Sequence, residues 1–263
     1  MRLSEASFDA VADMFHRISG IRLAPSKRQL VIGRLQKLAM ETGTPSLDDY
    51  VARVVSGDQS EMVKVVDRLT TNETYFFREP QHFQFLVDWI KQRRSGQPVR
   101  IWSAASSSGE EAYSIAMVLA DHIGPTGWEI VGTDLSTAMV EAASQALYPM
   151  ERARQTPPQY LKRFCLKGQG PYEGQFLVDK SLRARVRFLS ANLMQPLPDI
   201  GQFDIIFLRN VLIYFDPPAK RNIVERVCRQ LKPDGFLFTG HSESLSNLDV
   251  GLVSVQPAVY ARA

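Results

Sequence analysis

From residue 99 onward, short strand-like runs alternate with helix-like segments, and this alternation constrains the fold more than any other feature of the chain. The strand-like runs are Val99–Trp102, Glu129–Asp134, Phe203–Leu208 and Gly235–Gly240, and the helix-like segments are 110–120, 136–146 and 218–231. The run at 203–208 is almost entirely apolar, which is typical of a strand covered on both faces. The pattern predicts an α/β domain with a doubly wound, mainly parallel sheet.

One stretch, at about 150–186, breaks this alternation with residues that favour turns. These residues are Pro157, Pro158, Gly168, Gly170, Pro171 and Gly174. Because they stand between short strand candidates such as Phe176-Leu177-Val178, they predict a small antiparallel β-subdomain inserted into the α/β domain. Further on, Leu231–Gly235 predicts a helix stop and a tight turn before the last strand.

The first 75 residues show helical periodicity and no strand signal. Phe8, Val11 and Phe15 recur at three- and four-residue spacing, and Gly20 ends that pattern. Further helical segments are expected from Pro25 to about Met40, from Ser46, and at about 62–69. We therefore predict an all-α N-terminal domain at 1–75, a linker or connecting helix at 76–98, and the α/β domain at 99–263.

Composition narrows the class of protein. Of 263 residues, 44% are apolar and 22% charged, so a folded globular chain is expected. The chain lacks an apolar run long enough for a bilayer, and no signal peptide is recognisable, so we expect no membrane insertion. Two separated cysteines, Cys165 and Cys228, suit a reducing, cytoplasmic location. The four histidines (His16, His82, His122 and His241) have no metal-ligand spacing, so no metal site is predicted.

Polar residues at the carboxyl ends of the predicted strands indicate a ligand site, because open α/β sheets bind ligands at that edge. The loop Ser103–Glu111 lacks GxGxxG and carries two acids, which disfavours a dinucleotide and suits a ligand with a cationic amino group and a sulfonium. The alternative is a capped helix with exposed glutamates. Asp134 could accept hydrogen bonds from both ribose hydroxyls, or could be a helix N-cap.

Two further positions complete this predicted site. Asn192 could read an adenine edge while Leu193 covers the ring, or the pair could form an ordinary strand-end turn. Asn210-Val211 follows the strand at 203–208. Each signal is weak alone, but their order in one series of strands and helices favours S-adenosylmethionine (AdoMet) as the cofactor.

Four motifs make the chain resemble the CheR-type chemotaxis-receptor glutamate O-methyltransferases over almost its full length. The motifs are Thr71–Glu79, Trp102–Ala105 with Ser108–Ser114, Arg209–Phe215 and Gly240–Glu243. The first and third are long and unusual, so the resemblance is specific. It implies a Rossmann-like class I AdoMet methyltransferase domain with a β-subdomain, preceded by an all-α domain.

The resemblance also implies the site residues and the reaction. AdoMet contacts are implied at Asn72, Thr74, Arg78, Glu111, Asp134, Asn192, Leu193, Asn210 and Val211. Arg78 and Tyr214 are implied to lie near the transferred methyl group. The implied reaction esterifies glutamate side chains in the cytoplasmic helical domain of chemotaxis receptors, for sensory adaptation, and leaves S-adenosylhomocysteine.

The chemistry needs no general base, since a glutamate carboxylate has a pKa of about 4.3 and is ionised at neutral pH. Positioning the reactants and excluding water would suffice. Arg78 could hold the incoming carboxylate in a bidentate fork, or could be a structural partner of Glu79 or Glu111. Tyr214 could orient the carboxylate or simply wall the pocket.

A basic surface is expected near the N-terminus, because no acid occurs from Met14 to Met40. Lys27, Arg28, Arg34 and Lys37 are the candidate partner contacts. Three of them (27, 34 and 37) fall on an arc of about 80° in a helix. This basic helix face could simply be exposed to solvent, could bind nucleic acid, or could bind an acidic helix of a partner protein. No aromatic side chains interleave its charges for base stacking, and the resemblance favours an acidic receptor helix without nucleic acid.

The turn at Gly168 and Gly170 lies where some members of the family dock a receptor's C-terminal peptide, and strand addition there is physically reasonable. A monomer is expected. Two alternative functions stay open: an AdoMet methyltransferase for another acceptor, and a non-catalytic AdoMet-binding regulator.

Overall fold

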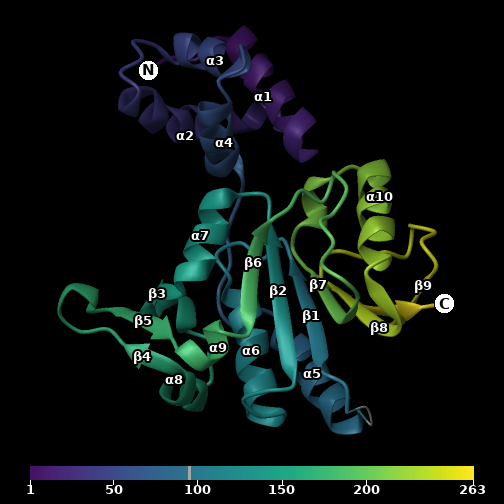
Figure 1. The fold of residues 1–263 in the computed structure, drawn as a ribbon. Helices are drawn as coiled ribbons and strands as arrows, with labels where there is room; N and C mark the ends of the chain where they lie inside the picture. Colours follow the sequence, from purple (N-terminus) through teal and green to yellow (C-terminus); the bar gives the residue numbers. More distant parts are fainter. Residues whose placement is uncertain (94–95) are drawn as a thin grey trace.

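The computed structural model describes residues 1–93 and 96–263, and Figure 1 shows how its elements are arranged. An N-terminal helical bundle sits at one end of a larger α/β domain, and a small sheet projects from the side of that domain. None of the helices in the two described ranges combines the length and the apolar composition that crossing a bilayer requires.

The N-terminal bundle contains α1 (Glu5–Ser19), η1 (Pro25–Lys27), α2 (Arg28–Glu41), α3 (Leu47–Val55) and α4 (Gln59–Leu69), which confirms the predicted all-helical character. Its helices begin at side-chain caps: Ser4, Ser46 and Asp58 accept hydrogen bonds from the first turns of α1, α3 and α4. Gly20 ends α1 with a left-handed φ of 76°. The bundle has its own apolar core, so it folds around contacts separate from the sheet.

The main sheet has seven strands in the order β6-β2-β1-β7-β8-β10-β9. They are β1 (Val99–Ala104), β2 (Trp128–Asp134), β6 (Val186–Ser190), β7 (Phe203–Leu208), β8 (Leu231–Thr239), β9 (Leu252–Gln256) and β10 (Val259–Arg262). The first five in spatial order pair in parallel, and the C-terminal β10 and β9 add antiparallel. The predicted doubly wound, mainly parallel sheet is confirmed. From β1 the chain adds β2 and β6 on one side, and β7 and β8 then follow on the other side, so the strand order reverses between β1 and β7.

Helices cover both faces of this sheet, which explains its apolar strands. They are α5 (Pro80–Gln92), α6 (Glu110–His122), α7 (Thr137–Gln145) and α10 (Pro217–Cys228). One core joins α5 and α6 to the β7 side chains Ile205 and Phe207, and a second joins α10 to Ile206 and Leu208. Because successive side chains of β7 enter opposite cores, both faces of the strand are buried, which explains why the run at 203–208 does not alternate between apolar and polar residues.

The predicted insert is a three-stranded antiparallel sheet in the order β3-β5-β4. Its elements are β3 (Leu147–Pro149), η2 (Met150–Ala153), α8 (Pro158–Phe164), β4 (Cys165–Lys167), η3 (Gly170–Tyr172), β5 (Gln175–Val178) and α9 (Lys180–Arg183). Phe176 and Val178 of β5 join the core that contains α6. The subdomain is therefore packed onto the α/β domain.

The expectation of a helix stop and tight turn at Leu231–Gly235 was wrong. Helix α10 already ends at Cys228, and the segment belongs to β8. Pairing with β7 is interrupted there, with Leu231 opposite Phe203 and the next pair formed by Phe236 and Ile205. The Pro-Asp-Gly sequence thus forms an irregularity inside a strand. Bulges of this kind are the places where strands accommodate proline and glycine.

We predict that Gly132→Ala destabilises the fold by about 1–3 kcal/mol, as overpacking does in close-packed cores. Gly132 lies in β2, and an added Cβ would overlap the Phe188 ring on β6. Urea unfolding measures the effect. The control is Gly33→Ala on α2, where nothing lies within 4 Å of the added atom and stability should be kept or slightly increased. Equal midpoints for the two variants would contradict the packing argument.

Candidate functional site

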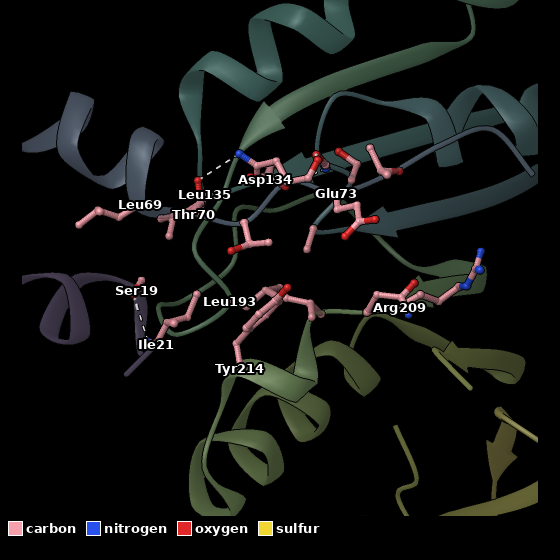
Figure 2. Close-up of a pocket in the computed structure, with 18 of the residues that line it drawn as sticks. Ser19, Ile21, Leu69, Thr70, Glu73, Asp134, Leu135, Leu193, Arg209 and Tyr214 are labelled. Carbon is pink, nitrogen blue, oxygen red and sulfur yellow. Dashed lines mark hydrogen bonds between the residues drawn. The ribbon is translucent and has the colours of Figure 1, made fainter. Parts of the chain in front are cut away.

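A cavity of about 320 Å³ lies between the N-terminal bundle and the carboxyl ends of the parallel strands. Figure 2 shows its walls, with Asp134 and Leu193 from the α/β domain facing the opening and Ser19 and Ile21 from the end of α1. It lies at the carboxyl ends of β1 and β7, where the strand order reverses, which is where open α/β sheets bind ligands. Its volume falls within the range of about 300–1,000 Å³ typical of small-molecule sites.

The walls of the cavity carry unusual backbone strain. Among the described residues, seven that are not glycine have positive φ, and five of these lie in or beside the cavity. They are Phe77 (57°), Glu79 (58°), Ala105 (57°), Ser107 (49°) and Asn210 (57°). Such conformations cost about 1–3 kcal/mol each and persist only where the surroundings hold them, which is common at functional sites.

All ten residues predicted to bind cofactor or to act in catalysis line this one cavity. They are Asn72, Thr74, Arg78, Glu111, Asp134, Asn192, Leu193, Asn210, Val211 and Tyr214. Their sequence positions span three motifs and four strand ends, so the fold brings them together from across the chain. Their individual roles stay predictions.

Asp134 ends β2 and is only 7% exposed. One carboxylate oxygen accepts a hydrogen bond from the Ser107 backbone N–H at 2.8 Å, and the other accepts one from Ser136 at 2.9 Å. The alternative role as helix cap is excluded, because Ser136 is the N-cap of α7. Burial raises the pKa of the Asp134 carboxyl, while the two N–H donors act in the opposite direction. Each oxygen keeps a lone pair for a hydroxyl donor in the cavity.

The two acids that begin α6 have different surroundings. Glu111 faces the cavity, accepts a hydrogen bond from the Ser103 hydroxyl at 2.7 Å and pairs with Arg209 at 3.0 Å. Glu110 is 1% exposed and accepts from the Ser108 hydroxyl at 2.7 Å. Burial raises the pKa of both carboxyls, and for Glu111 the Arg209 guanidinium opposes that shift. Exposed glutamates, the alternative interpretation of this loop, are therefore excluded.

Arg209 also lines the cavity, although it was not among the site residues predicted from the sequence. Its guanidinium is buried and lies 3.1 Å from a Glu79 oxygen and 3.0 Å from a Glu111 oxygen. It also donates to the backbone carbonyl of Arg78. The sequence did indicate a special role for this residue. An arginine directly after the apolar run Phe203–Leu208 is expected to be buried, and a buried arginine needs an anionic partner.

Glu243 is a second missed residue and fixes the turn after β7. It is 5% exposed, and one of its oxygens accepts hydrogen bonds from the backbone N–H groups of Asn210 at 2.6 Å and Gly240 at 2.7 Å. The other oxygen accepts from Ile213 at 3.2 Å. These bonds hold Asn210 in its left-handed conformation at the cavity wall.

Arg78 is not the structural ion-pair partner of Glu79 or Glu111, since Arg209 takes both. Within 1–93 and 96–263, no carboxylate forms a salt bridge with Arg78. Its guanidinium donates to the Glu73 carbonyl at 2.9 Å and lies 5.7 Å from the Tyr75 ring centroid. Its remaining donors are available to an anion, and Tyr214 reaches into the same cavity from η4 (Leu212–Tyr214; Figure 2).

Asn192 joins the α/β domain to the N-terminal bundle. Its side-chain N–H donates to the Ile18 carbonyl at 2.6 Å, and its oxygen accepts from the Met194 N–H at 2.9 Å. The side-chain oxygen thus forms the ordinary turn that was the alternative interpretation of this residue. Only one N–H of the side-chain amide remains to bind a ligand. Nearby, an atom added to Gly20 would lie 2.7 Å from Met194, so the end of α1 packs closely here.

The basic segment is only partly displayed to solvent. Arg28 donates to the Leu3 carbonyl, and Arg34 donates to the carbonyls of Leu69 and Thr70 at 2.8 and 3.1 Å. Lys27 and Lys37 are exposed, and Lys27 lies with Arg34 at the cavity wall. Arg28 and Arg34 thus hold the bundle together, and of the four candidate partner contacts only the two lysines are exposed.

Gly168 and Gly170 lie in the β4–β5 connection, at the end of the β-subdomain that points away from the main sheet (Figure 1). Gly168 has no room for a side chain, because an added Cβ would overlap the Tyr172 carbonyl. Strand β4 is an edge strand, and Leu166 on it is 56% exposed. An extended peptide would find unpaired backbone groups and an apolar side chain at this edge.

Two of the four histidines, which have no metal-ligand spacing in the sequence, come together in the structure. The ligand atoms of Glu79, His82 and His241 lie within 4.8 Å of one another. Residues that are distant in sequence meet here because α5 packs beside the end of β8.

Comparison with known proteins agrees with this geometry. A family model described as "CheR methyltransferase, SAM binding domain" matches residues 72–258, and one described as "CheR methyltransferase, all-alpha domain" matches residues 6–70. The chain belongs to the CheR methyltransferase family. As a member of this family it is an enzyme that uses AdoMet as methyl donor.

Curated relatives match it over nearly their whole length. A chemotaxis protein methyltransferase of Escherichia coli (strain K12) is 40% identical over 265 residues, which cover 99% of this chain and 92% of the relative. One from Salmonella typhimurium is 40% identical over 94% of this chain and 87% of the relative. Chemotaxis protein methyltransferase 2 of Pseudomonas aeruginosa is 40% identical over 97% of this chain and 92% of the relative.

We predict that Asp134→Asn weakens the binding of S-adenosylhomocysteine on the order of 10- to 100-fold, the effect of losing a charged hydrogen-bonding group. The new amide would also place N–H against the N–H of Ser107 or Ser136. Calorimetric titration measures the dissociation constant. Asp179→Asn is the matched control, since Asp179 accepts a backbone N–H from Ser181 at 2.8 Å in the β-subdomain, outside the cavity wall. Equal affinities of the two variants would contradict this role.

Proposed function

We propose that this chain transfers the methyl group of AdoMet to glutamate side chains in the cytoplasmic helical domain of chemotaxis receptors. The single observation that carries the proposal is the convergence of the ten predicted site residues on one cavity, with Arg78 and Tyr214 at its wall. The named relatives, which are chemotaxis protein methyltransferases, support the same process. The reaction would take place in the cytoplasm.

The cavity suits AdoMet in the chemistry of its walls. Asp134 would accept the ribose hydroxyls, and Leu193 would cover one face of the adenine. Glu111 would balance the positive amino group. When bound, AdoMet supplies a methyl group on a positively charged sulfur, and transfer to a carboxylate oxygen yields a neutral methyl ester and S-adenosylhomocysteine.

The protein's own part in the reaction is to position the acceptor and to exclude water. The acceptor carboxylate is ionised at neutral pH, so no residue has to remove a proton. Arg78 would hold it through free guanidinium donors and offset its repulsion by Glu111 and Asp134. The segment that follows α1, with Ile21 and Leu23, lines the side of the cavity opposite the sheet. Apolar side chains at this wall would help to exclude water, and electrostatic contacts are stronger where water is excluded.

The direct test is incubation of the purified protein with methyl-labelled AdoMet and receptor-containing membranes. We expect label on the receptor that mild alkali releases, because carboxyl methyl esters hydrolyse there. The negative control is Arg78→Ala, for which transfer should be lost. Alkali-stable label would indicate another acceptor, and cofactor binding without transfer would indicate a regulator. Either result would overturn the proposal.

The receptor surface is proposed to include the exposed face of α2. We predict that Lys37→Glu lowers kcat/KM for receptor methylation about fivefold at low ionic strength and less at high salt, as expected for an exposed charge. The dissociation constant for S-adenosylhomocysteine should stay unchanged, because Lys37 does not line the cavity. The matched control is Lys91→Glu on α5, an exposed lysine at the other end of the molecule (Figure 1). Equal rates for both variants would remove α2 from the docking surface.

Tethering through the β-subdomain is a further part of the proposal. The edge strand β4 and the Gly168–Gly170 turn would accept an extended receptor peptide by strand addition. The exposed Leu166 supports this role, because strand addition combines backbone hydrogen bonds with side-chain contacts along one edge.

A further inference from the structure

The Arg78 backbone lies between two strained neighbours. Phe77 has a φ of 57° and Glu79 a φ of 58°, which are left-handed values that non-glycine residues rarely adopt. The Phe77 N–H is held by the Ser114 hydroxyl at 3.0 Å, and the Arg78 carbonyl is held by Arg209. The position of Arg78 therefore depends on contacts from outside its own segment.

The Glu79 side chain supplies the contacts on the other side. One carboxylate oxygen lies 3.1 Å from the Arg209 guanidinium. The other accepts a hydrogen bond from the Asn210 side chain at 3.2 Å and lies 3.4 Å from the His241 N–H. Burial alone would raise the pKa of the Glu79 carboxyl, but Arg209 and the Asn210 hydrogen bond outweigh it, so the pKa is lowered. Glu79 is thus an anion that touches two residues of the cavity wall.

His82 lies directly behind this carboxylate. It is 1% exposed, its Nδ1 is 3.5 Å from a Glu79 oxygen, and neither ring nitrogen has a hydrogen-bond partner. Burial, with the nearby Arg209 charge, lowers the pKa of His82 to about 3, so the imidazole is neutral in the physiological range. A neutral ring does not compete with Arg209 as a cation, and with its proton on Nδ1 it would place an N–H beside Glu79.

A metal ion is the competing explanation for this cluster, because Glu79, His82 and His241 lie within ligand reach of one another. The Arg209 guanidinium lies 3.1 Å from the same carboxylate oxygen that would bind the ion. A fixed positive charge at that distance repels a divalent cation. The contacts therefore favour a role inside the protein for these groups.

We propose that Glu79 is a positioning residue for methyl transfer: its carboxylate, oriented by His82, holds Arg209 and the Asn210 side chain and so sets the place of Arg78. This inference rests on the proposed function only where it concerns turnover. Its effect on cofactor affinity, through Asn210, is independent of the acceptor.

The test compares Glu79→Gln with Glu61→Gln. Glu61 is a matched control, because it is 3% exposed and is bound by the Tyr50 hydroxyl at 2.8 Å and Lys64 at 2.7 Å in the N-terminal bundle. We expect Glu79→Gln to lower kcat and to weaken S-adenosylhomocysteine binding, each on the order of 10- to 100-fold, the effect of losing charged hydrogen bonds. Glu61→Gln should lose comparable thermal stability and keep both constants. Two variants with the same kinetic and binding constants would overturn the proposal.

A second pair of variants tests His82. His82→Asn keeps a side-chain N–H near the place of Nδ1, whereas His82→Leu removes it. We expect His82→Asn to recover most of the turnover that His82→Leu loses, and equal loss in both would contradict the orienting role. Titration with Zn²⁺ should show no binding that depends on His241. Zinc binding that His241→Ala abolishes would assign the cluster to a metal instead.

Failure of the two proposals can be told apart. If the wild-type protein transfers no methyl to receptors, the proposed acceptor is wrong, yet the S-adenosylhomocysteine affinities of the two glutamine variants still decide the role of Glu79. If the wild type is active and Glu79→Gln matches Glu61→Gln, only the positioning role fails.

Discussion

The guanidinium of Arg209 lies between the carboxylates of Glu79 and Glu111, and the geometry of the cavity depends on this contact. It joins the end of β7, the segment before α5 and the first turn of α6, which come from three distant parts of the chain. Removing one member of such a buried group leaves an uncompensated charge, which typically costs about 3–5 kcal/mol. The positive φ values of Phe77, Glu79 and Asn210 persist because this contact and Glu243 hold them.

The N-terminal bundle is as much a part of the cavity as the sheet. The Asn192 side chain donates to the Ile18 carbonyl, and Arg34 donates to carbonyls at the end of α4. The Asn192 bond keeps the end of α1 over the carboxyl ends of the strands, where a transferred methyl group would have to be shielded from water, and the Arg34 bonds hold α2 against the end of α4. The bundle thus combines a wall of the site with a surface on which Lys37 is exposed.

Several elements could be predicted because their signals are local. The almost entirely apolar run at 203–208 was enough to predict strand β7. Apolar residues at three- and four-residue spacing, followed by Gly20, were enough to predict α1. The Leu231–Gly235 segment could not be predicted correctly, because Pro and Gly signal a turn in isolation, whereas pairing with β7 draws them into β8. The N-cap role of Ser136, rather than Asp134, likewise depended on which side chain faces the helix.

The sequence by itself determined the class of fold, the carboxyl ends of the strands that carry the site, and ten of the residues that line the cavity, since periodicity and motifs record short-range order. Only the tertiary structure decided which charges meet. It paired Arg209, not Arg78, with the two glutamates, placed Ile18 against Asn192, and brought His82 beside His241. The physical reason is that a buried charge is paired by whatever lies beside it in space, and that neighbour is set by the packing of helices on the sheet rather than by distance along the chain.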